Sequence, residues 1–206
     1  MPWPMTHFSV AFQYLEHPDP AFLLGSIAPD AVLVRDNDIK GKVKSHLGKN
    51  PNIEDYFNFI RINKGDEIID QQYSQFLLGY IAHIFVDLKW AELKLKISNH
   101  DVSLKDRLWQ EENQMDFHLY RTVEWKNQLV KDIKNSPLLQ LDGLYEINEL
   151  EKWRHKIFEW LENPNHEPKI QNEYITMDRV DSFVKQSTED LKELFHELQV
   201  DLDFNM

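Results

Sequence analysis

The segment from Phe76 to Trp90, FLLGYIAHIFVDLKW, constrains the fold more than any other part of the chain. Nearly every residue as far as Val86 is aliphatic or aromatic, and a helix that is apolar on all sides must lie inside a protein. His83 and Asp87 would then be buried with it. Residues four apart project from the same helical face, and a buried carboxylate is costly unless it is paired or binds a metal ion. This spacing therefore suits a cation held by both side chains.

The other apolar segments also have a helical rather than an alternating pattern. Helices are predicted at residues 6–15, 52–61, 73–97, 144–161 and 180–198. A short apolar segment at 21–28 ends at Pro29-Asp30, and no strand or hairpin signal competes with these helices. We therefore expect an all-α fold, in which residues 1–206 form a single-domain multi-helix bundle around a buried central helix.

Residues 36–52 are polar and contain glycine and proline, so they are predicted to form a long loop. Four lysines surround His46 in this stretch: Lys40, Lys42, Lys44 and Lys49. Such lysines are most often a solvated surface, and contact with a phosphate or an anionic headgroup is the alternative.

One long helix is predicted from a cap at Ser103 to Ile133, with an apolar stripe along one face. Glu112 and Asp116 lie four residues apart at the margin of that stripe. They repeat the pattern of His83 and Asp87, and they are ordinary solvent-side charges if the stripe is displaced by one residue.

Charge and composition limit the possible partners. The formal net charge is −12, which argues against a protein that coats double-stranded nucleic acid but is compatible with a small phosphate ester. Because there is no cysteine, a metal ion would have to be held by His, Asp and Glu, which favours zinc. The amino terminus has no secretory pattern, and the longest apolar run is shorter than the roughly 20 residues that span a bilayer. We expect a cytoplasmic protein without a transmembrane segment.

Four short segments appear in an order that is similar to the zinc-dependent phospholipase C family. They are THFSVAFQYL with His7, FLLGSIAPD with Asp30, KSHLG with His46, and FLLGYIAHIFVD with His83 and Asp87. The resemblance covers roughly the first 120 residues. It implies an all-α metal hydrolase fold that phospholipases and some single-strand nucleases share.

The resemblance also implies a ligand set of one to three zinc ions. Asp30, His46, His83 and Asp87 would surround one zinc, and Asp87 would bridge to a second ion held with His7. Asp30 and Asp87 are then the candidate catalytic carboxylates. The implied reaction is in-line attack of a zinc-bound hydroxide on a phosphodiester.

The chain departs from the family in two respects. Secreted members use their mature amino-terminal residue as a ligand, whereas here Met1-Pro2-Trp3 precedes His7. They also hold a further zinc with a His after the buried Asp and a His-x-x-x-Glu on the next helix, which this sequence lacks. Glu112 and Asp116 are the additional metal candidates that would replace those ligands.

The leading functional prediction is a metal-dependent hydrolase of a phosphate ester, either phospholipid-like or soluble. The alternative is a non-catalytic, metal-stabilised helical interaction protein. In a third hypothesis no metal is bound, and His83 and Asp87 form a buried hydrogen-bonded pair. His7 is then a partly exposed residue of the first helical turn, and Asp30 is a helix cap. His46 is one more polar residue of the loop.

Overall fold

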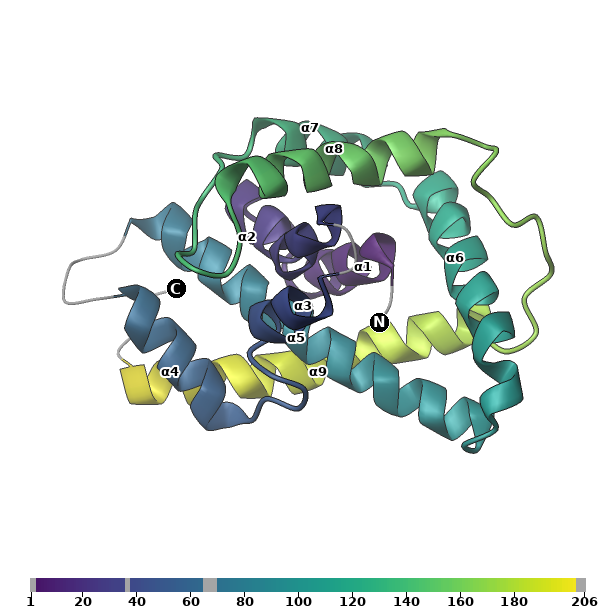
Figure 1. The fold of residues 1–206 in the computed structure, drawn as a ribbon, viewed down its shortest axis with the longest axis horizontal. Coiled ribbons are helices and arrows are strands. Elements are labelled where there is room, and N and C mark those ends of the chain that lie inside the picture. The colour runs from purple at the N-terminus through teal and green to yellow at the C-terminus, as the bar shows by residue number, and fades with distance from the viewer. Residues whose placement is uncertain (1–2, 36–37, 65–69, 203–206) are drawn as a thin grey trace.

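A computed structural model describes residues 3–35, 38–64 and 70–202, with side chains as far as residue 198 (Figure 1). In chain order the helical elements are α1 (Pro4–Tyr14), α2 (Pro20–Gly25), the 3-10 helix η1 (Ala28–Val34), α3 (Ile39–Ser45), α4 (Ile53–Lys64), α5 (Gln71–Ser98), the 3-10 helix η2 (Val102–Leu104), α6 (Lys105–Thr122), α7 (Lys126–Asn135), α8 (Ile147–Glu162) and α9 (Met177–Leu202). No strand occurs in the described ranges. The predicted all-α fold is confirmed.

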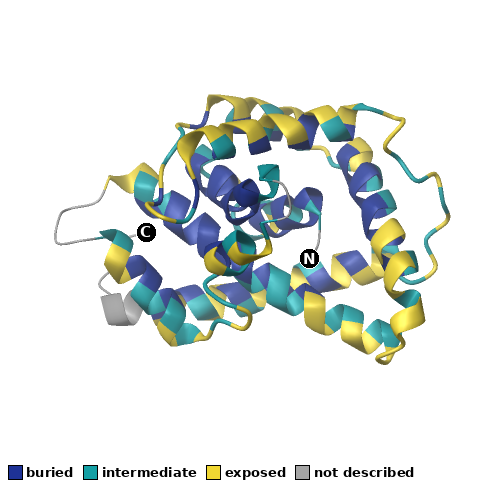
Figure 2. Ribbon diagram, viewed as in Figure 1, coloured by how far each residue is buried: buried dark blue, intermediate teal, exposed yellow. Residues whose placement is uncertain are grey.

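The helix α5 is the central element of the bundle, as its apolar sequence predicts. Figure 1 shows it crossing the molecule, with α1, α2 and α3 near its middle and α9 crossing it on the other side. Buried residues follow one another along the first half of α5, whereas α6, α8 and α9 bury one face and expose the other (Figure 2). None of the described helices is both long enough and apolar enough to cross a membrane.

The helices α2 and α5 pack closely against each other, and this contact depends on two glycines. A Cβ atom added at Gly25 would lie 2.2 Å from the backbone oxygen of Phe76, and one added at Gly79 would lie 2.1 Å from the backbone oxygen of Phe22. Both distances are shorter than any tolerable contact, so only glycine lets the two backbones approach this closely. The approach brings the end of α2 beside the middle of α5.

The prediction of a long loop at residues 36–52 is partly wrong, because residues 39–45 form the helix α3. Asp38 caps this helix by accepting a hydrogen bond from the backbone N–H of Gly41 at 2.7 Å. The helix ends at His46, where Leu47 and Gly48 both have positive φ and the Gly48 N–H bonds back to the carbonyl of Val43. His46 is therefore placed by a helix end rather than by a loop.

The prediction of a single helix from Ser103 to Ile133 is also wrong, because α6 and α7 are separate helices. Val123 is extended, with ψ 133°, and ends α6. Trp125 begins α7, and its ring stacks on that of Phe12 at a centroid distance of 4.2 Å. The break has no proline or glycine, so packing of this partly buried tryptophan against α1 favours the turn over continued helix.

Candidate metal centre

Five of the residues singled out in the sequence meet at one place in the bundle. His7 comes from α1, Asp30 from η1, His46 from the end of α3, and His83 with Asp87 from α5. His7, Asp30, His46 and His83 are each less than 9% exposed. Four separate chain segments thus bring three imidazoles and two carboxylates together inside an otherwise apolar core.

The carboxylates lie between the imidazoles at separations too long for good hydrogen bonds. The Nε2 atom of His46 lies 3.3 Å from Asp87 Oδ2 and 3.5 Å from Asp30 Oδ1, and His7 Nε2 lies 3.4 Å from Asp87 Oδ1. His83 Nε2 is 3.8 Å from Asp87 and 3.9 Å from Asp30. All three Nε2 atoms are buried and make no hydrogen bond. Unpartnered buried nitrogens of this kind are rare and call for an explanation.

Hydrogen bonds to backbone carbonyls fix the orientation of two of the rings. His83 Nδ1 lies 2.8 Å from the carbonyl oxygen of Ser26, and His46 Nδ1 lies 2.9 Å from that of Lys42. A carbonyl accepts only from a protonated Nδ1, so the tautomer that makes these bonds carries its lone pair on Nε2, which faces the centre. This is the tautomer that a metal ligand requires.

Burial and mutual contact hold these groups in the charge states that suit a cation. Burial, together with the adjacent His7 ring at a centroid distance of 4.0 Å, keeps the pKa of His83 well below its usual value, so its imidazole is neutral. Burial alone would raise the pKa of Asp87, but its polar surroundings outweigh burial and keep that pKa well below its usual range, so the carboxyl is ionised. Neutral imidazole and ionised carboxylate are the states in which both bind metal.

The ligand atoms form two overlapping groups. One contains His7, His83 and Asp87, and the other contains Asp30, His46 and His83; within each group the atoms lie within 4.8 Å of one another. Zinc with ligands at 2.0–2.1 Å in a tetrahedron separates those ligands by about 3.3–3.4 Å. The distances of His46 and His7 to the carboxylates already match that separation, so the residues present fit a divalent ion.

The simpler roles considered for these residues do not agree with the geometry. At 3.8 Å, His83 and Asp87 are not a hydrogen-bonded pair. His7 is buried within α1 rather than partly exposed, and Asp30 lies inside η1, whose N-cap residue is Ile27. His46 faces the carboxylates and is not a solvated loop residue.

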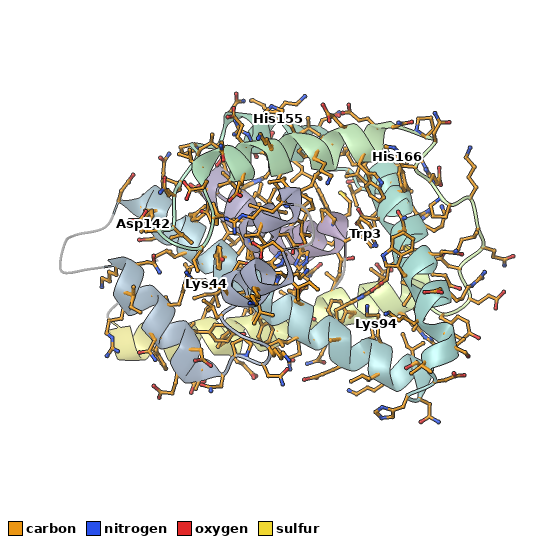
Figure 3. The ribbon with its side chains drawn as sticks, in the orientation of Figure 1. Trp3, Lys44, Lys94, Asp142, His155 and His166 are labelled. Atoms are coloured by element: carbon orange, nitrogen blue, oxygen red, sulfur yellow. The ribbon has the colours of Figure 1, made fainter. Side chains whose placement is uncertain are left out.

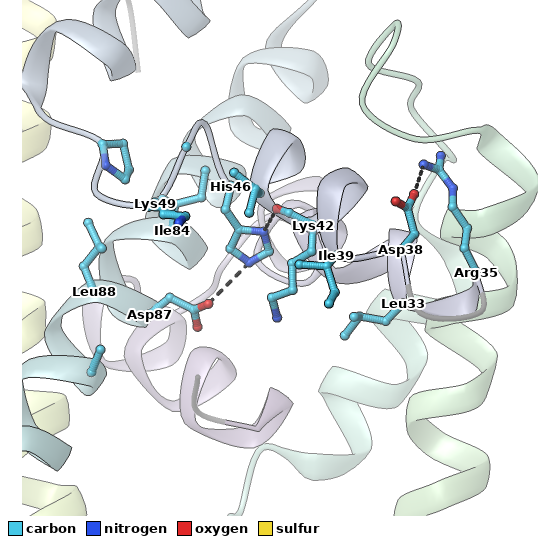
Figure 4. A pocket seen from close by; sticks show the side chains of 14 residues that line it. Leu33, Arg35, Asp38, Ile39, Lys42, His46, Lys49, Ile84, Asp87 and Leu88 are labelled. Atoms are coloured by element: carbon cyan, nitrogen blue, oxygen red, sulfur yellow. Dashed lines mark hydrogen bonds and ion pairs between the residues drawn. The ribbon is translucent and has the colours of Figure 1, made fainter.

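A pocket of about 530 Å³ reaches the centre from outside (Figure 4). His46 and Asp87 form part of its wall, beside Lys42 and Arg35. Apolar side chains that include Leu33, Ile84 and Leu88 line much of the rest. A small molecule entering this pocket would therefore meet two of the candidate ligands directly.

The additional candidates Glu112 and Asp116 are buried, as the stripe predicts, but the structure places them in neither ligand group. Glu112 accepts a hydrogen bond from the indole of Trp90 and pairs with Lys94 at 2.9 Å. Asp116 accepts a hydrogen bond from the backbone N–H of Met5 at 2.8 Å. Glu112 and the Oδ1 atom of Asp116 thus have partners outside the two groups, whereas the buried Oδ2 atom of Asp116 has none. Their part in metal binding stays a prediction. Their partners are a distant indole and a distant backbone amide, which no local sequence pattern reveals.

The burial of Asp116 leads to a pH-dependent prediction. Burial raises its pKa well above the usual value, and the Met5 hydrogen bond opposes this only in part. The folded protein therefore holds this proton more tightly than the unfolded chain, so the free energy of unfolding falls as the pH rises above about 4.

The variant Asp116→Asn tests this dependence, because it keeps an acceptor for the Met5 N–H and needs no proton. It should gain about 1.4 kcal/mol over the native chain per pH unit until the folded pKa is passed. Urea unfolding without added metal at several pH values measures this, and a difference that stays constant with pH would contradict it.

Two elements that position the centre were not recognised in the sequence. The carbonyl of Ser26 orients His83, and the hydroxyl of Tyr80 donates a hydrogen bond to the carbonyl of Ser45 at 2.5 Å. That bond ties the end of α3, and hence His46, to α5. Backbone acceptors leave no mark in a sequence. The capping pair Asp38 and Gly41 was the available signal for α3.

Comparisons with protein-family models, with curated protein sequences and with solved structures gave no match to this chain.

Proposed function

We propose that this chain is a metal-dependent hydrolase of phosphate esters, with zinc as the metal and a small phosphodiester as the substrate class. We further propose that it is related to the zinc-dependent phospholipase C family and acts in the cytoplasm. The observation that carries the proposal is the convergence of three unpartnered Nε2 atoms on two carboxylates. Those of His7 and His46 lie from Asp87 at the separation of a tetrahedral zinc site.

The pocket favours catalysis over a purely structural ion. A structural zinc is closed off by protein ligands, whereas a catalytic one keeps a position that substrate or water can reach. His46 and Asp87 line the pocket, so the centre is accessible on that side. The alternative of a non-catalytic, metal-stabilised interaction protein does not account for this opening.

The positions of the residues indicate the chemical role that each would have. A zinc ion held here would lower the pKa of a bound water from 15.7 to about 7 and would polarise the phosphoryl oxygen. Three imidazoles would hold the ion in place, those of His7, His46 and His83. The carboxylates of Asp30 and Asp87 would supply negative charge, and their oxygen atoms could take a proton from the attacking water. In the overall reaction the water oxygen bonds to phosphorus, the bond from phosphorus to the ester oxygen breaks, and a proton ends on the released alcohol.

The direct test is hydrolysis of bis(p-nitrophenyl) phosphate by the zinc-loaded protein. We expect zinc-dependent release of p-nitrophenol that a chelator abolishes, and a value of kcat/KM at least about 100-fold lower in Asp30→Asn, equivalent to about 2.7 kcal/mol. His155→Ala is the matched control, because His155 is exposed on α8 away from the centre (Figure 3). Zinc-loaded protein without activity, or with the same activity in Asp30→Asn, would argue against the proposal. Comparison with p-nitrophenyl phosphate separates diester from monoester preference.

A further inference from the structure

Lys42 is a cation placed at the meeting point of the pocket and the metal centre. It lies on α3 four residues before His46, so the two side chains project from the same helical face. Its Nζ atom lies 3.2 Å from Asp30 Oδ1, and its side chain is 29% exposed. Figure 4 shows the ammonium group pointing into the space beside the carboxylate of Asp87. Lys42 therefore contacts both a candidate ligand and the volume that a substrate would fill.

The other cations of the pocket are placed differently. Arg35 binds Glu149 through two of its nitrogens, at 2.5 and 2.6 Å, and binds Asp38 through a third at 2.9 Å. Figure 4 shows its guanidinium directed at Asp38 and away from Asp87. Lys49 lines the pocket, but no ion pair joins it to a candidate ligand in the part of the chain that the structure describes. Among these described cations, Lys42 is the one paired with the centre.

A phosphodiester brings negative charge to this position. Charge on its non-bridging oxygens must be stabilised as the bond to the leaving oxygen breaks, and a cation fixed in advance at that place does so without reorganisation. An ammonium group donates hydrogen bonds and accepts none, which matches phosphoryl oxygens. A metal ion that shares Asp30 would draw carboxylate charge away from Lys42 and leave its ammonium better able to bind a second anion.

We propose that Lys42 is a catalytic residue of this site, whose Nζ donates a hydrogen bond to a non-bridging oxygen of the substrate phosphoryl group. The inference rests on the proposed hydrolase function and adds to it a substrate contact from the protein itself. No proton leaves Lys42, and the bonds that form and break remain those of the hydrolysis. The competing role is structural: Lys42 would only neutralise Asp30 and so help to fold the centre.

The test compares Lys42→Met and Lys42→Arg with Lys44→Met. Lys44 is the matched control because it lies on the same helix, is exposed and does not line the pocket, so its substitution makes the same change in net charge (Figure 3). We expect Lys42→Met to retain zinc and its melting temperature, to lose about 10- to 100-fold in kcat, and to bind inorganic phosphate at least 10-fold more weakly. Lys42→Arg should recover part of both losses, and Lys44→Met should behave like the native chain.

Two results would overturn the role of Lys42. One is a zinc-loaded Lys42→Met protein with unchanged kcat and unchanged phosphate affinity. The other is loss of zinc in that variant, which would assign Lys42 to the support of Asp30. Failure of the proposed function looks different, because the native chain itself would then lack zinc-dependent hydrolysis. Phosphate binding to the native chain, measured by calorimetry beside Lys42→Met, still reports on Lys42 in that case.

Discussion

Protein incubated with zinc and then desalted should carry at least one equivalent of the metal, and the double variant His83→Ala with Asp87→Ala should carry none above background. His83 supplies a ligand atom to both overlapping groups and Asp87 to one of them, so removing the two residues leaves neither group with three ligands. Metal content measured by mass spectrometry on untagged protein gives the result directly. If zinc is present at about 100 times its dissociation constant, it should stabilise the native chain by about 2.7 kcal/mol. For a chain of this length that corresponds to a melting temperature about 5–10 °C above that in chelator.

The matched control for this experiment is His155→Ala, which also removes a histidine but from an exposed position. It should keep both the metal and the chelator-dependent shift. Native protein that takes up no divalent metal would overturn the metal centre. The buried histidines and aspartates would then be a polar network whose unpartnered nitrogens need another explanation.

The second large effect is expected at Gly79, where alanine should destabilise the fold. At an exposed helical position alanine is more favourable than glycine by about 1 kcal/mol. Here the added Cβ would lie 2.1 Å from the carbonyl oxygen of Phe22, and this oxygen belongs to backbone that cannot rotate away. We expect α2 to be pushed from α5 at a cost of about 3 kcal/mol or more in the free energy of unfolding. The same displacement would move the carbonyl of Ser26 from His83, so zinc affinity should fall as well.

Gly41→Ala is the comparison that separates backbone collision from the loss of glycine as such. Its added Cβ would meet the side chain of Asp38, which can rotate, so the expected cost is about 1 kcal/mol from a weakened cap. Urea unfolding of both variants measures the difference. Equal stability of Gly79→Ala and the native chain would mean that α2 and α5 do not approach as closely as described.

The sequence predicted the parts of the fold that depend on local pattern. The burial of α5 follows from its run of apolar residues, and the inward faces of Glu112 and Asp116 follow from the stripe on α6. The convergence of His7, Asp30 and His46 on α5 was inferred only from resemblance, because no rule of spacing relates residues so far apart. Physical reasoning from one sequence therefore identified the pair on α5 and needed three-dimensional contacts for the rest.

The errors arose where tertiary contacts decide the local conformation. α3 is rich in lysine and only seven residues long, so its helical form depends on the Asp38 cap and on Tyr80, which binds the carbonyl at its end. The break between α6 and α7 depends on the packing of Trp125 against Phe12. Neither contact leaves a periodic signal in the residues whose conformation it sets.

The hydrogen bond from His83 to the carbonyl of Ser26 affects how this site would tolerate sequence variation. Every residue type supplies that carbonyl, so position 26 is free to change over generations as far as this bond is concerned. Positions 25 and 79 are not, because any side chain larger than that of glycine would move the carbonyl away. In related chains, we therefore expect both glycines to be invariant, and we expect no polar residue to be conserved beside the imidazole of His83.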